Sequence, residues 1–401
     1  GLDMKKLLPL SLICLFSGLQ VTAQTAIIQS VLQKIETTYA PDKRVIVFDV
    51  SLQENENEAV LKGEISEPEI HNIMITKIKE ICPEIRDSIR LLPDKSFGEN
   101  QWGIVPLSAI YISKAPDFGA EITTQALMGT PVRILERKGG WLRVQTPDRY
   151  IGWTSTDDIE RINRKKLNEY NQLRKVIVTS HHTFVLKNPN KNSEIITEAI
   201  LGNLMVVNEM KQGKKYLSVT LPDGKTGYVR KEDIRPFQHG EINLSANSII
   251  KLGKSFMGLP YFWGGTTSRG MDCSGFTKLV FFMQGIILPR DASQQYYSGT
   301  EVDTSAGWGN LRKGDLLFFG KKNASNPEKP SIVHVAIYIG DLKFIHSSGE
   351  IKINSFDPAS SDYDNFNHAR FIGAKRIDGI VPNGYWNLYT HPWYTSTITS
   401  K

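Results

Sequence analysis

The hydrophobic and polar positions of the first hundred residues predict a small α+β unit over residues 24–100. Apolar residues recur at helical spacing in Ala26–Thr37 and in Pro68–Ile81, where the pattern can continue to Ile89. Between these helices, the runs Val45–Leu52 and Ala59–Ser66 predict two strands. The unit carries no recognisable chemistry, so we expect a scaffold or an interdomain brace.

Short strand-like runs separated by glycine-containing turns predict two tandem β-barrels, over residues 101–162 and 175–237. The segment Ala120–Gly129 returns 73 residues later as Ser193–Gly202, and the run that starts at Trp141 returns 75 residues later at Tyr216. A repeat of short strands that closes on a glycine and an aromatic residue resembles bacterial SH3-like domains. The charged link between the two barrels, RINRKKLNEYNQLRK, is predicted to be helical.

A single cysteine, Cys273, lies between a glycine-rich loop and an apolar segment in YFWGGTTSRGMDCSGF, residues 261–276. Apolar residues follow it at helical spacing, at Phe276, Leu279, Val280 and Met283. Cys273 is therefore predicted at or just before a helix N-terminus, where unpaired backbone NH groups favour a thiolate. The loop glycines would let a substrate backbone approach the sulfur. A buried cysteine that acts as a small hydrophobe is the alternative, although polar Asp272 and Ser274 argue against an apolar pocket.

Two histidines lie downstream in strand-like runs and are candidates for the base that a cysteine nucleophile needs. His334 interrupts SIVHVAIYIG, and His346 lies in LKFIHSS. A histidine in an apolar strand is often a core residue with satisfied hydrogen bonds. The combination of all three residues, however, supplies a nucleophile, a base and an orienting group. A two-residue hairpin would place the histidines on opposite faces, so we expect a longer loop or a bulge near Gly340.

The N-terminus predicts a secretory signal, residues 1–23, with cleavage after Ala23. Two lysines precede an apolar run from Leu7 to Leu19, and small residues follow it. This run is too short for a membrane anchor, because a spanning helix needs roughly 20 residues. Residues 1–3 precede the apparent start at Met4 and are left out of this reasoning. We expect an exported protein, periplasmic or secreted, without a transmembrane anchor after signal removal.

Composition excludes few classes of protein. The chain has 401 residues, of which 40% are hydrophobic, and this length suggests about two to four domains. The net charge of +6 suits an anionic wall surface, although such a surplus is also ordinary for a solvated surface. No motif supports nucleic-acid binding. Cys82 and Cys273 remain after signal removal, and we expect both to stay reduced, because a disulfide would consume the proposed thiolate.

Six runs between Leu259 and about Ile377 resemble the NlpC-type cell-wall cysteine peptidases, a family with a papain-like core. They are PYFWGG, DCSGF, PRDASQQY, LRKGDLLFF, HVAIYIG and FIHSSG, in the family's order. The resemblance implies a catalytic domain over residues 240–380, with Cys273 as nucleophile, His334 as general base and His346 as the third polar residue. The fold class is then α+β: a papain-like cysteine peptidase domain preceded by two small SH3-like β-barrels and the N-terminal α+β segment.

The resemblance extends to a three-domain subgroup in which the first barrel packs beside the catalytic cleft. There a glutamate and a tyrosine of that barrel help to bind the substrate's free amine, and Glu121 and Tyr150 match them. Asp291 would join Glu121 at the amine, and Arg290 would pair with a carboxylate. Ala292 stands where the subgroup often has serine, so the contact that a serine hydroxyl would make at this position is not expected here. The second barrel lacks the tyrosine and is expected to be structural.

Four further residues flank the nucleophile and are assigned to the substrate cleft: Tyr261, Trp263, Asp272 and Ser274. The two aromatic residues are either core residues or cleft walls, and the glycines beside them favour the cleft. Asp272 either holds a ligand amide or fixes the loop. The Tyr261 hydroxyl is also a candidate donor to the oxyanion, beside the Cys273 backbone NH.

Together these assignments predict a cysteine endopeptidase that cuts between γ-D-glutamate and the following diamino acid of peptidoglycan stem peptides with a free N-terminal L-Ala. A non-catalytic wall-binding protein, and an acyltransferase or amidase with the same site, stay open as alternatives. We expect a monomer that acts on peptidoglycan-derived peptides without a cofactor or a metal, since the other histidines show no ligand spacing. The aromatic tail, residues 381–401, is interpreted as packing, or as a glycan-stacking surface if it is exposed.

Overall fold

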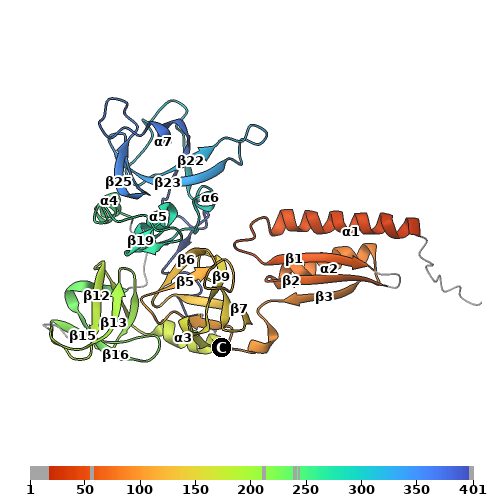
Figure 1. Cartoon of the computed structure of the whole chain (residues 1–401), viewed down its shortest axis with the longest axis horizontal. Helices are drawn as coiled ribbons and strands as arrows, with labels where there is room; N and C mark the ends of the chain where they lie inside the picture. The colour runs from red at the N-terminus through yellow and green to blue at the C-terminus, as the bar shows by residue number, and fades with distance from the viewer. Residues whose placement is uncertain (1–17, 55–57, 210–213, 238–241, 243, 397–401) are drawn as a thin grey trace, which may run out of the picture. The chain divides into compact units, whose positions relative to one another are not determined.

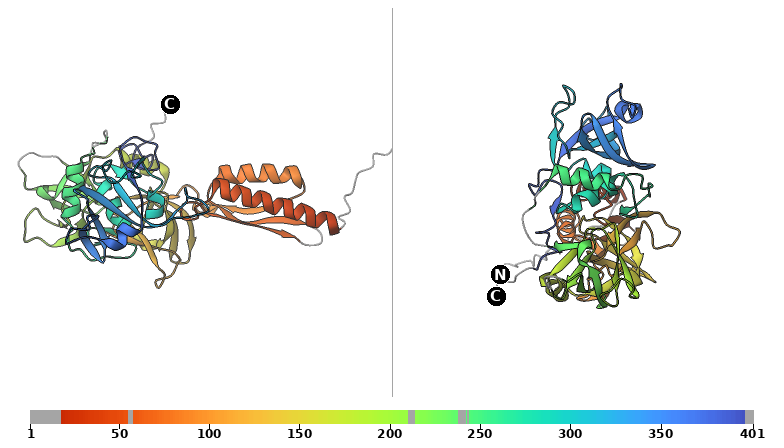
Figure 2. Two further views of the ribbon diagram at one scale, coloured as in Figure 1. Left: turned by 90° about the horizontal axis from the view of Figure 1, so that it is seen from above. Right: turned by 90° about the vertical axis from the view of Figure 1, so that its left-hand side faces the viewer.

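The computed structural model describes residues 18–396, apart from 55–57, 210–213, 238–241 and 243. The chain divides into two compact units, Gly1–Asp94 and Lys95–Lys401. In the first unit, two helices pack together over one face of a three-stranded sheet, as Figures 1 and 2 show. The helices are α1 (Gly18–Tyr39) and α2 (Pro68–Ile81), and the strands are β1 (Phe48–Glu54), β2 (Ala59–Ile65) and β3 (Arg86–Leu91).

The core of the first unit follows the helical period of the sequence. In α2, Ile70, Met74 and Ile78 are buried against the sheet. The expected continuation of this helix to Ile89 is wrong, because residues 86–91 instead pair in parallel with β2. Cys82, which precedes Pro83, has extended backbone angles and ends α2, since proline disfavours the helical conformation of the residue before it.

Two seven-stranded sheets with the same topology follow in the second unit. The first has the order β10-β4-β7-β8-β9-β5-β6 and the second the order β17-β11-β14-β15-β16-β12-β13, so each strand has its counterpart seven strands later. This equivalence confirms the internal repeat. The strands of the first are β4 (Trp102–Ile104), β5 (Ala109–Ser113), β6 (Ile122–Leu127), β7 (Pro131–Lys138), β8 (Trp141–Gln145), β9 (Ile151–Ser155) and β10 (Glu160–Ile162). Those of the second are β11 (Lys175–Val178), β12 (His182–Leu186), β13 (Ile195–Ile200), β14 (Leu204–Val207), β15 (Tyr216–Thr220), β16 (Thr226–Arg230) and β17 (Ile234–Phe237).

The link between the barrels is helical, as expected: α3 spans Arg164–Gln172 and begins at the cap residue Asn163, whose side chain accepts a hydrogen bond from the Lys166 backbone NH. Short 3-10 turns, η2 (Thr156–Asp158) and η3 (Lys231–Asp233), occupy equivalent places before the last strand of each barrel. The aspartate that ends each turn accepts side-chain hydrogen bonds within its own barrel. The two equivalent aspartates, Asp158 and Asp233, therefore hold the last turn of each barrel in the same way.

The catalytic domain combines a six-stranded sheet, of order β21-β26-β22-β23-β24-β25, with short helices. In Figures 1 and 2, α4 and α5 lie between this sheet and the two barrels. The helices are α4 (Ala246–Lys254), α5 (Cys273–Phe282), α6 (Ala292–Gln295) and α7 (Asn365–Ala369). The sheet strands are β21 (Thr300–Val302), β22 (Leu316–Lys321), β23 (Ser331–Gly340), β24 (Lys343–Ser348), β25 (Glu350–Ser355) and β26 (Phe371–Arg376). Short pairs are formed by β18 (Thr266–Thr267) with β19 (Gly270–Met271), and by β20 (Ile286–Ile287) with β27 (Trp386–Asn387).

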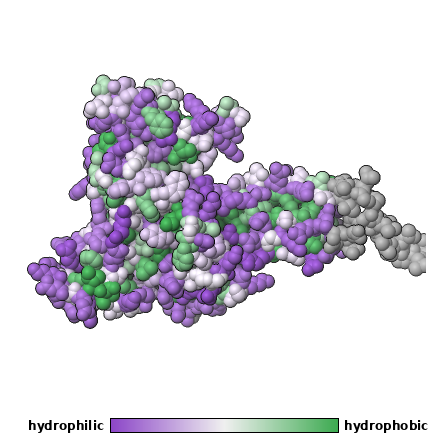
Figure 3. All heavy atoms as spheres, in the orientation of Figure 1, coloured by the Kyte–Doolittle hydropathy of each residue, from purple (hydrophilic) through white to green (hydrophobic). Residues whose placement is uncertain are grey.

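One apolar core joins the catalytic domain to both barrels. The predicted apolar face of α5 is buried in it, with Phe276 and Val280 fully inaccessible, and Leu127 of the first barrel and Leu201 of the second belong to the same cluster. On the face that Figure 3 shows, the surface is mostly hydrophilic with separate apolar areas. The barrels are therefore fixed parts of the second unit, held by the same burial that positions α5.

The aromatic tail packs against the protein, which supports the packing interpretation. Trp393 and Tyr394 are buried, and the ring of Trp393 meets Trp102 of the first barrel edge to face at 5.1 Å. Asn171 of α3 donates to the Trp393 carbonyl at 3.0 Å, and His391 hydrogen-bonds the Pro147 carbonyl at 3.0 Å. These contacts leave the two rings no free face for a glycan.

The predicted signal falls mainly on residues 1–17, which lie outside the described residues. None of the helices in the described part of the chain combines the length and apolarity that a bilayer span requires.

Candidate active site

Cys273 is the first residue of α5, as the sequence predicts. The preceding residue, Asp272, has extended backbone angles and caps the helix, with its Oδ1 accepting from the Gly275 NH at 2.7 Å. Its Oδ2 accepts from the Gly264 NH at 3.1 Å, which ties the glycine-rich loop to the helix start. The cap therefore fixes the backbone on both sides of the sulfur.

Arg290 is buried and holds the same aspartate with both arms of its guanidinium. Nη2 lies 2.6 Å from Asp272 Oδ2, and Nη1 lies 3.1 Å from Oδ1 and 2.9 Å from the Ser274 hydroxyl. Arg290 was expected to pair with a carboxylate, and with only 1% of its surface exposed it pairs with that of Asp272. Of the two roles considered for Asp272, the contacts favour fixing the loop, and Ser274 belongs to the same buried network.

The loop glycines accommodate the protein's own backbone rather than leaving space for a substrate. A Cβ on Gly264, whose φ is +78°, would lie 2.2 Å from the Ile122 carbonyl oxygen of the first barrel. A Cβ on Gly265 would lie 2.4 Å from the Gly270 carbonyl oxygen. Close approach of backbone segments is thus the reason for glycine at these positions.

His334 and His346 share one face of the sheet because β23 carries a bulge. Tyr338 pairs with Phe344 but Gly340 pairs with Lys343, which leaves Ile339 without a partner residue. The bulge expected near Gly340 is thereby confirmed, and it shifts the register by one residue. As a result His334 Nε2 lies 2.7 Å from His346 Nδ1.

Asn354 on β25 continues this chain of hydrogen bonds and was not singled out from the sequence. Its Oδ1 lies 2.8 Å from His346 Nε2. Residue parity along EIKINS would have placed it on the histidine face once the β24–β25 register, in which Phe344 pairs with Asn354, was known. Gln295 was missed as well: it is buried and binds the Thr277 hydroxyl and the Ser274 carbonyl, supporting the first turn of α5.

The sulfur of Cys273 lies beside the strand that carries the first histidine. The backbone NH of Val335, the residue after His334, donates to it and lowers its pKa. Burial and the neighbouring Asp272 carboxylate outweigh this effect and raise the pKa of Cys273 to about 11. The expectation that the helix start favours a thiolate is corrected, because 8% exposure leaves the anion poorly solvated.

Both imidazoles are held neutral in the resting site. Burial, and then the neighbouring His346, lower the pKa of His334 well below its usual value. Burial also lowers the pKa of His346 to about 4, although the Asn354 hydrogen bond opposes this shift. The arrangement therefore presents a thiol and two neutral imidazoles, which suits proton transfer during attack rather than a preformed ion pair.

Tyr261 borders the nucleophile from the other side of the loop. Its backbone NH donates to the Gly349 carbonyl at 2.8 Å. Burial, then the charges of Cys273 and Asp272, raise the pKa of its hydroxyl. This phenol therefore stays a hydrogen-bond donor across the neutral pH range.

The first barrel reaches the catalytic segment through two of the residues matched to it. Glu121 Oε1 accepts from the Trp263 indole NH at 2.9 Å, and the Trp263 side chain is otherwise largely exposed. Tyr150 is buried and lies within electrostatic range of Arg290, whose pKa it helps to raise. Asp291, next to Arg290, starts α6 with its NH donating to Gln294 Oε1 at 3.0 Å.

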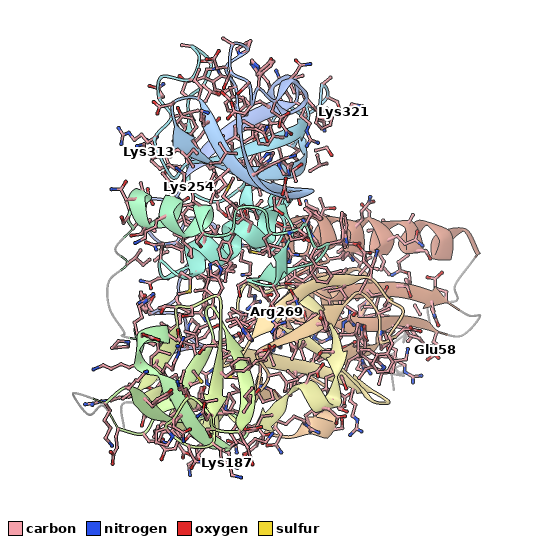
Figure 4. The ribbon with its side chains drawn as sticks, turned by 60° about the vertical axis from the view of Figure 1, so that its left-hand side comes forward. Glu58, Lys187, Lys254, Arg269, Lys313 and Lys321 are labelled. Atoms are coloured by element: carbon pink, nitrogen blue, oxygen red, sulfur yellow. The ribbon has the colours of Figure 1, made fainter. Side chains whose placement is uncertain are left out.

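Both barrels also contact the β18–β19 hairpin, which precedes the nucleophile in the chain. Gln125 of the first barrel accepts from the Thr266 NH at 3.0 Å. Glu198, at the equivalent position of the second barrel, pairs with Arg269, which Figure 4 labels where the hairpin meets the barrels. The second barrel thus contributes to the position of the catalytic loop without supplying a cleft residue.

The chemistry that this site supports is thiol-based acyl transfer, with a base, an orienting group and donors around one sulfur. Cys82 and Cys273 are free thiols. In the described part of the chain, no group of three or more His, Cys, Asp or Glu side chains is arranged to hold a metal ion.

Comparisons with known proteins agree with this geometry. Residues 258–372 match the model of the NlpC/P60 family, and residues 112–159 match that of the bacterial dipeptidyl-peptidase Sh3 domain. A gamma-D-glutamyl-L-lysine dipeptidyl-peptidase of Bacillus cereus is 34% identical over 238 residues, which cover 57% of this chain and 67% of the relative. Its Bacillus subtilis counterpart is 31% identical over 56% of this chain and 72% of its own length.

Two further proteins extend the comparison. Dipeptidyl-peptidase 6 of Lysinibacillus sphaericus is 29% identical over 60% of this chain and 87% of its own length. The crystal structure of an NlpC/P60 family protein from Bacillus cereus superimposes with a TM-score of 0.59 at 26% identity, covering 69% of this chain and 99% of that protein. The expected architecture of a papain-like domain with SH3-like barrels is confirmed.

Proposed function

The chain belongs to the NlpC/P60 family of cysteine peptidases, and from this premise we propose that it hydrolyses the γ-D-glutamyl to diamino acid bond of peptidoglycan stem peptides. The substrate carries a free N-terminal L-Ala, and the released product is L-Ala-γ-D-Glu. The names of the relatives in Bacillus cereus and Bacillus subtilis, both gamma-D-glutamyl-L-lysine dipeptidyl-peptidases, support this bond. The observation that carries the proposal is the hydrogen bond between Glu121 and Trp263, which brings a barrel carboxylate to the loop before the nucleophile.

His334 is the general base in the proposed mechanism. It accepts the proton of the Cys273 thiol as the sulfur attacks the γ-carbonyl carbon, and the imidazolium then returns this proton to the departing amine of the diamino acid. A water molecule resolves the thioester: His334 accepts a proton as the water oxygen attacks. It returns this proton to the departing Cys273 sulfur as the γ-carboxyl product is released. His346 stabilises and orients the imidazolium, in the role that the third residue of a triad performs.

The oxyanion of each tetrahedral intermediate needs donors that are already in place. The Cys273 backbone NH lies at the start of α5, where it has no partner within the helix, and the Tyr261 hydroxyl stays protonated beside the sulfur. Each such donor contributes about 3 kcal/mol to transition-state stabilisation. The second donor is the one that a Tyr261→Phe variant removes.

Selectivity for a free amine follows from carboxylates at one end of the cleft. Glu121 and Asp291 would both pair with the ammonium group of L-Ala, and Tyr150 would close that end. A peptide whose amine is acylated, as in intact wall, would leave these carboxylates without a cationic partner. We therefore propose that the protein acts on released peptides, in cell-wall recycling or turnover, after export.

The test compares L-Ala-γ-D-Glu-diamino acid tripeptides, with lysine or diaminopimelate, and their N-acetylated twins. We expect cleavage of the free peptides, none by Cys273→Ala, and a rate on the acetylated peptides at least about a hundredfold lower. Glu121→Gln should reduce this discrimination. Glu194→Gln is the matched control, because Glu194 occupies the equivalent position in the second barrel and its carboxylate pairs with Lys187 at the surface.

Other outcomes of this experiment separate the alternatives. Equal cleavage of free and acetylated peptides would contradict amine recognition but leave the peptidase intact. Transfer of the acyl group to an added amine, in place of hydrolysis, would indicate an acyltransferase. Binding of wall material that is unchanged in Cys273→Ala, without any cleavage, would indicate a wall-binding protein.

A further inference from the structure

A continuous chain of hydrogen bonds runs from the proposed base to the backbone of the loop after β25. His334 Nε2 lies 2.7 Å from His346 Nδ1, and His346 Nε2 lies 2.8 Å from Asn354 Oδ1. The other end of the amide is bound too, because Asn354 Nδ2 donates to the Asp362 carbonyl oxygen at 3.1 Å. Each ring nitrogen in this chain except His334 Nδ1 has a partner.

The direction of every bond in the chain follows from its last member. A backbone carbonyl can only accept, so the amide NH₂ of Asn354 must face Asp362, and its oxygen must face His346. An amide oxygen also only accepts, so His346 carries its proton on Nε2. Neutral His346 then accepts at Nδ1, and His334 must donate from Nε2.

We propose that Asn354 is a positioning residue that sets the tautomers of both histidines and so presents the Nδ1 lone pair of His334 as the base for Cys273. This inference rests on the proposed function only for its kinetic readout. In the opposite tautomer, His334 would carry a proton on Nδ1 and could not accept one from the thiol. Asn354 thereby acts on the nucleophile through two imidazoles.

Asn354 is fixed firmly enough for this role. It pairs with Phe344 across the β24–β25 ladder, and the next residue, Ser355, donates from its NH to the same Asp362 carbonyl at 2.9 Å. The Asp362 side chain is held in turn by Lys343 Nζ at 2.9 Å. A flipped amide would place Oδ1 against the Asp362 carbonyl oxygen, where neither atom can donate.

Charged groups around the histidines favour the neutral rings that the tautomer argument needs. Lys352, paired with His346 across the strands, and Arg370 both disfavour an imidazolium. Asp364 acts in the opposite sense on His346. The carboxylate of Asp362 is engaged by Lys343 and by the Ser360 hydroxyl.

The first test uses Asn354→Leu and Asn354→Asp, with Lys343→Met as the matched control. The leucine removes the acceptor, so kcat should fall about ten- to a hundredfold with little change in KM. The aspartate keeps an acceptor for His346 Nε2 and restores much of kcat, but its charge favours the imidazolium. The acidic limb of its pH–rate profile should therefore move to higher pH.

Lys343→Met loosens the same loop without touching the amide or the rings. If Asn354 were only a brace for this loop, Lys343→Met and Asn354→Leu would lower kcat alike and Asn354→Asp would not move the pH profile. That pattern would overturn the proposal.

The second test needs no peptide substrate. Two-bond ¹H–¹⁵N correlation of the wild-type protein at pH 8 should show His334 and His346 both protonated on Nε2, and Asn354→Leu should populate the Nδ1 form. Alkylation of Cys273 by iodoacetamide, followed by mass spectrometry of its peptide, should slow in Asn354→Leu but not in Lys343→Met. A wild-type His346 protonated on Nδ1 would sink the inference even if the variant did not fold. Failure of the substrate proposal alone would leave both readouts unchanged.

Discussion

Arg290 shows how one buried charge supports the reactive residue through the two residues that flank it. Its guanidinium pairs with Asp272 and Ser274 on either side of Cys273, and Asp272 in turn caps α5. Burial disfavours the charge of Arg290, but the paired carboxylate raises the pKa of its guanidinium above the ordinary value. Arg290 also lowers the pKa of the Cys273 thiol, against the larger effects of burial and Asp272.

Arg290→Met should destabilise the protein by about 3–5 kcal/mol, because it leaves the Asp272 carboxylate buried without its partner. The double variant Asp272→Asn/Arg290→Met should lose less, since the remaining groups are then neutral. Urea denaturation of the single and double variants measures the coupling. A loss below about 1 kcal/mol in Arg290→Met would show that the pair is dispensable for stability.

At the scale of elements, a single unpaired residue decides which face each histidine occupies. Ile339 has no partner in the β23–β24 ladder, while Asp341 and Leu342 have φ of 53° and 59° and form the tight turn. These two features together allow a two-residue turn and a shared face for His334 and His346.

Deletion of Ile339 should give a regular hairpin in which Tyr338 still pairs with Phe344. Because His334 and His346 then keep their shared face, kcat should stay within about fivefold of wild type. Deletion of Ile337 instead turns His334 to the other face and should abolish cleavage. Both variants have the same length, and circular dichroism verifies that each folds. Inactive but folded protein after deletion of Ile339 would contradict the register argument.

At the scale of the second unit, a buried ion pair joins the first barrel to the nucleophile helix. Lys278 of α5 lies 2.9 Å from Asp148, with side-chain exposures of 18% and 2%. Burial would raise the pKa of Asp148, but the charge of Lys278 and hydrogen bonds from Thr146 and Lys278 together hold it below the usual value. Its contribution to stability is thus present at neutral pH and is lost as the pH falls through this lowered pKa.

Lys278→Met should cost about 3–5 kcal/mol at pH 7, because Asp148 would stay buried and unpaired. The difference from wild type should shrink in acid, where the variant's carboxyl binds a proton first. Lys187→Met removes an exposed ion pair with Glu194 in the second barrel and should cost less than about 1 kcal/mol. Thermal unfolding at pH 7 and pH 4 measures both losses of stability. Equal losses in the two variants would show that the buried pair contributes no more to stability than an exposed one.

The sequence by itself determined what local periodicity and residue order encode. Helical spacing after Cys273 placed the nucleophile at a helix start, and repeat offsets gave two equivalent barrels. Parity between His334 and His346 required a longer loop or a bulge, and the structure has the bulge. These features depend on neighbours along the chain, so the pattern carries them. The extension of the second helix to Ile89 failed because pairing with a distant strand overrode it.

Only the tertiary structure decided what depends on burial and on segments far apart in sequence. The carboxylate that pairs with Arg290 proved to be that of Asp272, and burial reversed the expected shift of the Cys273 pKa. The role of Asn354 emerged only from the packing of β23, β24 and β25, which brings its side chain within hydrogen-bond distance of His346. Desolvation and cross-strand contacts arise from the packed chain as a whole, and no local pattern of residues records them.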